Sequence, residues 1–140
     1  MSTSVTGRKL SAQHKLILID LSATLFCALF GAVYERFSHG VYAYGMLYAF
    51  AFPLVLGVLP FTLIWMLRAP YPPKALRDVY HAGIAALTVG SIICGVLEIY
   101  GTTSPLTLVY WLLGGALTAF GAVGYLILLA KRRGATVSRA

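Results

Sequence analysis

The residues that could do chemistry lie in and beside long apolar stretches. The stretch "YERFSHG" places Glu35, Arg36 and His39 directly behind an apolar run. Glu35 and His39 are four positions apart, so they share a face if a helix continues through this stretch. With Glu98 they would supply nitrogen and oxygen ligands suited to zinc or another divalent ion. We call Glu35, Arg36, His39 and Glu98 the outer cluster; it predicts either a cation site or only the charged boundary of a membrane span.

Two polar stripes follow helical periodicity inside the apolar stretches. Their members recur at spacings of three, four or seven, which places each set on one side of a helix. The first stripe contains Asp20, Thr24, Cys27, Gly31 and Glu35, and the second contains His81, Thr88, Ser91, Gly95 and Glu98. Ionisable side chains inside a membrane are costly when they face lipid. We therefore expect the two stripes to face each other or a shared cavity.

The stripes predict polar groups at two depths. Asp20 and His81 are expected near the cytoplasmic side, and Glu35 with Glu98 near the outside, roughly 22 Å of helix away. Hydroxyls and thiols between them could form a path for a proton or a small cation. The same groups could equally act as two structural staples that hold helices in register.

Composition decides the class of protein. The chain has 140 residues, of which 59% are hydrophobic and only 11% are charged. Four stretches supply the roughly 20 apolar residues that a helical span requires, at about 16–36, 41–67, 80–100 and 105–130. The predicted fold is an all-α integral membrane four-helix up-down bundle, with a basic arm at 1–15 and a basic tail at 131–140. Pro53 and Pro60 predict a bend in the second span.

The basic residues predict orientation. They gather before the first span, between the second and third, and after the fourth, whereas the two other loops hold only Arg36. By the positive-inside rule, both termini are predicted to be cytoplasmic, in the cytoplasmic (inner) membrane. The formal charge of +7 does not indicate nucleic-acid binding, because the basic residues lack an aromatic stacking platform.

A small-residue face predicts close helix packing in the fourth span. Gly114, Thr118 and Gly121 repeat at the spacing that lets another backbone approach. The sequence leaves open whether the approaching helix belongs to this chain or to a neighbouring subunit. Cys27 and Cys94 lie deep within spans and are interpreted as small hydrophobes.

Motifs of catalysis are missing from the sequence, which has no glycine-rich phosphate loop, nucleophile elbow, HExxH or C-x-x-C. No cofactor is expected. A haem- or quinone-binding redox protein is a lesser alternative, since His14 and His81 are the only two histidines that could approach one depth.

The stretches "YERFSHGVYAYGMLYAFAFPLVLGVLPF" and "GVLEIYGTTSPL" resemble small four-span bacterial membrane proteins of unassigned function. This resemblance implies no activity. The first functional hypothesis is a non-catalytic accessory or regulatory subunit of a membrane complex, with a partner membrane subunit or copies of itself. The alternative is a small protein of cation or proton transport or sensing that uses Glu35, His39 and Glu98.

Overall fold

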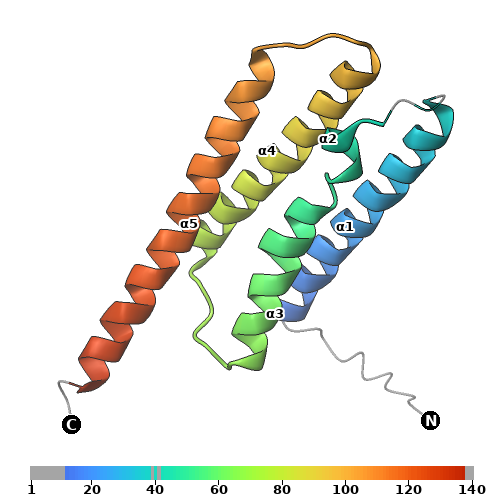
Figure 1. Cartoon of the computed structure of the whole chain (residues 1–140). Coiled ribbons are helices and arrows are strands. Elements are labelled where there is room, and N and C mark those ends of the chain that lie inside the picture. Colours follow the sequence, from blue (N-terminus) through green and yellow to red (C-terminus); the bar gives the residue numbers. More distant parts are fainter. Residues whose placement is uncertain (1–11, 39, 41, 138–140) are drawn as a thin grey trace, which may run out of the picture.

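The computed structural model describes residues 12–38, 40 and 42–137, with side chains as far as residue 135. The described residues are mostly helical and contain no strand (Figure 1). The elements in order are α1 (Ala12–Phe37), α2 (Tyr44–Leu47), the π-helix η1 (Pro53–Val58), α3 (Leu59–Met66), α4 (Lys74–Ile99) and α5 (Leu106–Val137).

Three of these helices, α1, α4 and α5, are long and apolar enough to cross a membrane. They correspond to the first, third and fourth predicted spans. α4 begins directly after Pro73. Proline is tolerated there because the first N–H groups of a helix have no partner within the helix.

The second predicted span is broken rather than merely bent. α2 ends in a turn at 48–50, after which the chain is helical from 51 to 66 with η1 in its middle. Pro53 and Pro60 each lack the N–H that would bond to the carbonyl four residues earlier, so a regular α-helix cannot run through both. The 14 residues Pro53–Met66 extend only about 21 Å, less than the hydrocarbon thickness of a bilayer.

The helices form an open row. α1 packs on α2, η1 and α3; α4 packs on α2 and η1 from the other side; α5 packs on α4. Among the described residues, no Cα atom of α1 comes within 8 Å of one in α4 or α5. The broken second span consists of α2, η1 and α3, and we call it the second helix. It therefore lies between α1 and the α4–α5 hairpin (Figure 1). The sequence predicts an up-down four-helix bundle; the described helices form an all-helical arrangement in which α1 does not pack on α5.

Burial in α1 is reversed relative to a soluble protein. Its buried residues are Asp20, Thr24, Cys27 and Gly31, which are members of the first stripe. Large apolar side chains such as Leu25 and Phe26 are exposed instead. This pattern suits a lipid environment, where apolar side chains lose nothing by facing outward and small or polar groups mediate contact between helices.

The small-residue face of α5 packs on α4 of the same chain. A Cβ atom added to Gly114 would lie 2.9 Å from the backbone nitrogen of Leu87, and one added to Gly121 would lie 2.7 Å from Cβ of Tyr80. Thr118 is buried, and its hydroxyl donates to the Gly114 carbonyl at 2.8 Å. This face is thus occupied within the chain, which resolves the question that the sequence leaves open.

We predict that Gly83→Ala destabilises the protein by about 1–3 kcal/mol, the usual cost of overpacking. The new Cβ would meet the Thr118 backbone nitrogen at 2.5 Å and the Gly114 carbonyl oxygen at 2.9 Å, so α4 and α5 would have to separate. Thermal unfolding in detergent measures this. Gly115→Ala is the matched control, because nothing lies within 4 Å of its Cβ position; equal losses for both variants would contradict the packing argument.

Candidate functional site

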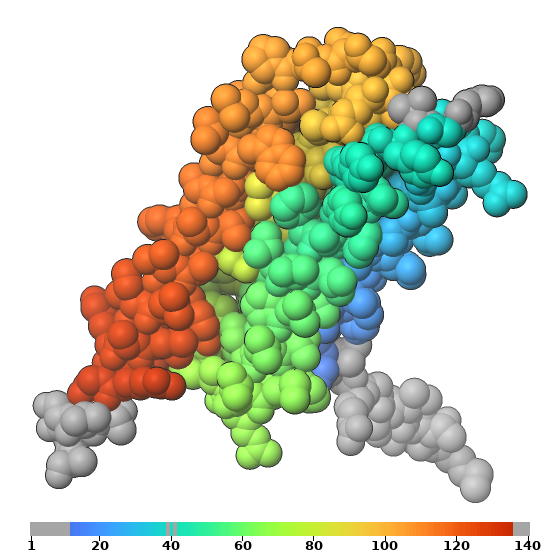
Figure 2. All heavy atoms as spheres, in the orientation of Figure 1, coloured from blue at the N-terminus to red at the C-terminus, as the bar shows by residue number. Residues whose placement is uncertain are grey.

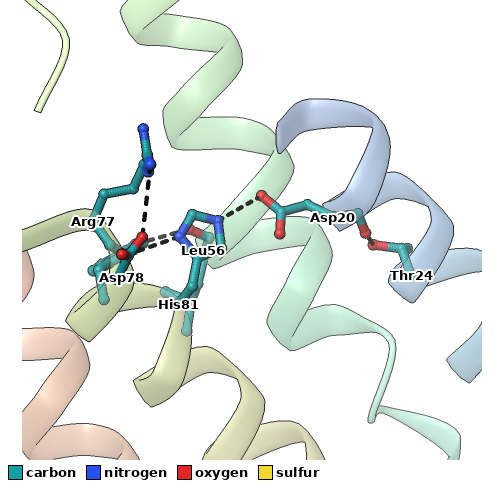
Figure 3. A network of polar contacts seen from close by, with 7 residues as sticks. Asp20, Thr24, Leu56, Arg77, Asp78 and His81 are labelled. Carbon is teal, nitrogen blue, oxygen red and sulfur yellow. Dashed lines mark hydrogen bonds and ion pairs between the residues drawn. The ribbon is translucent and has the colours of Figure 1, made fainter. Parts of the chain in front are cut away.

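A buried carboxylate and a histidine connect two helices whose backbones do not touch. Asp20 of α1 is only 5% exposed. Its Oδ2 lies 3.1 Å from Nε2 of His81 on α4. Figure 3 shows the two side chains extending toward each other from their helices. This contact, the Asp20–His81 pair, joins the two residues that the sequence analysis expects at similar depth.

The broken helix leaves room for this contact at Gly57. A Cβ atom at this position would lie 2.8 Å from Cγ of Asp20 and 2.9 Å from its Oδ2. Gly57 is buried within η1. A π-helical turn inside an α-helix is frequently found at functional sites. Here the π-helical turn and the missing side chain together let the Asp20 carboxylate pass the second helix and reach α4.

Aromatic rings enclose the histidine. The Phe61 ring stacks on the His81 ring with centroids 4.9 Å apart and 26° between the planes. The Tyr80 hydroxyl donates to the Leu56 carbonyl at 2.8 Å. That carbonyl lacks the usual donor four residues later, because residue 60 is proline. The second helix is therefore joined to α4 by one stacked ring and one hydrogen bond beside the Asp20–His81 pair.

Hydrogen bonding determines how many protons the pair holds. Nδ1 of His81 lies 3.0 Å from the Arg77 carbonyl oxygen, which can only accept, so Nδ1 carries a proton. Nε2 and the Asp20 carboxylate are then hydrogen-bonded only if one further proton lies between them. Either an imidazolium donates to a carboxylate, or a carboxylic acid donates to a neutral imidazole. Without that proton, a lone pair on Nε2 would face a negatively charged oxygen.

Among the described residues, three other titratable side chains interact with the pair, from the connection after α3 and from α4. They are Tyr71, Arg77 and Tyr80. Arg77 pairs with Asp78 at 3.6 Å and lies over the Tyr71 ring, 5.6 Å from its centroid. Burial raises the pKa of the Tyr71 hydroxyl, and the Arg77 charge opposes this effect. The pair is thus bordered by one guanidinium and two phenols.

Beyond His81, the second stripe packs against α2 rather than against α1. The Ser91 hydroxyl donates to the Gly45 carbonyl, and a Cβ at Gly95 would lie 2.6 Å from the Met46 nitrogen. On α1, a Cβ added to Gly31 of the first stripe would lie 3.1 Å from the carbonyl oxygen of the same Met46. The expectation that the stripes face each other therefore holds at Asp20–His81, whereas further along α2 separates them.

The structure describes only part of the outer cluster. Glu98 is exposed, and Oε1 of its carboxylate lies 3.7 Å from Sγ of Cys94 on its own helix. Glu35 borders a cavity of about 10 Å³ together with Ile99, and Arg36 is exposed. His39 lies outside the described residues. No hydrogen bond or ion pair between described residues joins Glu35, Arg36 and Glu98, so a cation site there stays a prediction.

The histidines, cysteines and acidic residues are the side chains that could bind a metal ion or haem iron. No three His, Cys, Asp or Glu side chains within the described ranges are grouped so that they could hold a metal ion. His14 lies against Trp65, with ring centroids 5.5 Å apart. Both ring nitrogens of His81 are engaged by Arg77 and Asp20, so binding haem iron would require breaking one of these contacts.

Residues of the second helix complete the site, and sequence periodicity alone does not single them out. Gly57, Phe61 and Leu56 surround the pair, yet each looks like an ordinary apolar residue of a span. The signal that could have found them is the spacing "GVLP", a glycine three residues before a helix-breaking proline.

Comparison of the chain with known protein families, curated proteins and solved structures finds no significant match. The geometry itself must therefore support the functional argument.

We predict that Gly57→Ala and Asp20→Ala are strongly non-additive in the free energy of unfolding. Gly57→Ala forces a Cβ into the Asp20 carboxylate, but most of this clash disappears when Asp20 is truncated. A double-mutant cycle by thermal unfolding in detergent should give a coupling of about 1–3 kcal/mol. Additive losses would show that Asp20 does not pass the second helix at this glycine.

Proposed function

We propose that this chain is a non-catalytic regulatory membrane protein with four spans, in which the proton held between Asp20 and His81 sets the helix arrangement. The observation that carries the proposal is that this pair links α1 to α4, whose backbones do not pack. An ionisable pair inside a membrane is expensive to keep, which favours a functional use.

The gathering of basic side chains at one end of the molecule supports the four-span topology. The start of α1, the connection after α3 and the end of α5 lie at one end of the row (Figure 1). We call it the basic end. Its described basic residues are Lys15, Arg68, Lys74, Arg77, Lys131, Arg132 and Arg133. By the positive-inside rule this end, with both termini, faces the cytoplasm of a cytoplasmic membrane.

Loss of the shared proton is the regulatory event in this proposal. With the proton present, the carboxylate and the imidazole attract each other across the second helix. With the proton lost, a buried negative charge faces a lone pair at the 3.1 Å separation of Oδ2 and Nε2, which is strongly unfavourable in a medium of low polarity. α1 would then move away from α4, or water would enter between them.

Proton conduction along the stripes is less well supported than a local switch. Hydroxyls of both stripes donate to backbone carbonyls: Thr24 to Asp20, Thr88 to Ile84 and Ser91 to Gly45. A relay needs hydroxyls that hand protons to one another. Transport or sensing of a cation by Glu35, His39 and Glu98 is the alternative function, and it depends on the outer cluster closing around His39.

Partner binding, if the protein is a subunit of a complex, would use other surfaces than the sequence suggests. The small-residue face of α5 is already covered by α4. The outward faces of α1 and α5 carry exposed apolar side chains such as Leu29 and Leu112. These faces suit lipid, a membrane partner or a second copy of the chain.

We predict that stability in detergent falls as pH rises above about 6.5, the ordinary pKa of histidine, because only the unfolded chain then gives up this proton. Since the folded state holds the shared proton, removing it should cost about 1–3 kcal/mol. Asp20→Asn should fold and abolish this slope, because an amide can donate to neutral Nε2 above this pH. Thermal unfolding against pH measures both.

Matched controls separate the pair from the other histidines. His14→Gln and His39→Gln should keep the slope of the wild type. The proposal is wrong if Asp20→Asn retains the same pH dependence as the wild type, or if the wild type has none.

A further inference from the structure

A second feature of the basic end is an apolar cavity between α3, α4 and α5. Its volume is about 360 Å³, within the range of roughly 300–1,000 Å³ typical of small-molecule sites. Figure 2 shows the surface hollowed between α3 and α5, with α4 at the bottom of the hollow. The cavity exists because α3 and α4 share no close backbone contact, so that Phe61, Tyr80 and other side chains only partly fill the space.

The walls of the cavity are almost entirely apolar. Pro60 and Ile64 contribute from α3, Leu76 from α4, and Ala122 and Leu126 from α5. The two tyrosines among the lining residues already donate their hydroxyls to backbone carbonyls, Tyr80 to Leu56 and Tyr125 to Pro70. The walls therefore suit a hydrocarbon chain rather than a polar solute.

Among the described residues, one charged side chain lines the cavity, and it belongs to the basic end. Arg77 is the fourth residue of α4, and only 16% of its side chain is exposed. Its Nε and the nearby Tyr71 hydroxyl are buried and have no hydrogen-bond partner among the described residues. Arg132 borders an adjacent small cavity that shares Pro72 and Tyr125 with this one. The cavity thus combines apolar walls with a cationic mouth.

We propose that this cavity binds one anionic phospholipid, with an acyl chain between α3 and α5 and the phosphate at Arg77. Basic pockets between membrane helices on the cytoplasmic side bind the head groups of anionic lipids. Charge complementarity selects this occupant: Arg77 lines the cavity, and Arg132 borders the adjacent small cavity. The acidic side chain paired with Arg77 at 3.6 Å, Asp78, is 57% exposed.

The test is native mass spectrometry of the full chain in detergent, titrated with phosphatidylglycerol or with phosphatidylcholine of the same acyl chains. The wild type should bind one phosphatidylglycerol at least about tenfold more tightly than phosphatidylcholine, the scale of one charged hydrogen bond. Arg77→Gln should remove this preference. Lys74→Gln, one turn earlier at an exposed position, is the matched control and should keep it.

A second pair of variants tests the cavity itself. Ala122→Phe places a ring among the lining residues and should abolish tight binding of phosphatidylglycerol. Ala119→Phe, on an exposed position of the same helix, should leave it unchanged. Equal affinity of the wild type for the two lipids, or a preference that survives Arg77→Gln, would overturn the proposal. So would a dimer of the chain that forms without lipid and dissociates on Ala122→Phe, because a second copy would then occupy the cavity.

Discussion

The structure depends on one constraint: the Asp20 carboxylate is inside a membrane protein and must find a partner across an intervening helix. Its partner is His81, at 3.1 Å, and the route passes the Cβ-free position of Gly57. A buried carboxylate without a partner would be severely unfavourable. The turn at 48–50 and the π-helical segment between Pro53 and Pro60 are therefore best understood together with this contact.

The described helices form two pairs, joined by the packing of α2 and η1 on α4 and by the Asp20–His81 pair. α4 and α5 pack closely through Gly83, Gly114 and Thr118, whose small side chains let the backbones meet. α1 packs on the broken second helix through its own small and polar residues. In lipid there is little hydrophobic force between helices, so such close contacts and a few polar links must hold the pairs together.

The Asp20–His81 pair and the apolar cavity share contacting residues. Phe61 stacks on His81 and also lines the cavity. Arg77 accepts the hydrogen bond of His81 through its backbone carbonyl, while its side chain borders the cavity. A molecule in the cavity would therefore touch the same side chains that hold the histidine. If both proposals hold, lipid at the basic end and a proton at the pair act on the same side chains between α3 and α4.

The sequence by itself determined the membrane class, three of the spans and the face of α1 that is buried from Asp20 to Gly31, because these follow from local hydropathy and from helical periodicity. It also placed Asp20 and His81 at one depth, since both lie near the beginnings of helices that run in the same direction. Only the tertiary structure decided that the second helix breaks and stands between the stripes. Only it assigned the α5 glycine face to α4, and it made Gly57 the opening for Asp20. Periodicity reports which side of a helix is polar, whereas the identity of the neighbour depends on packing between segments far apart in the chain.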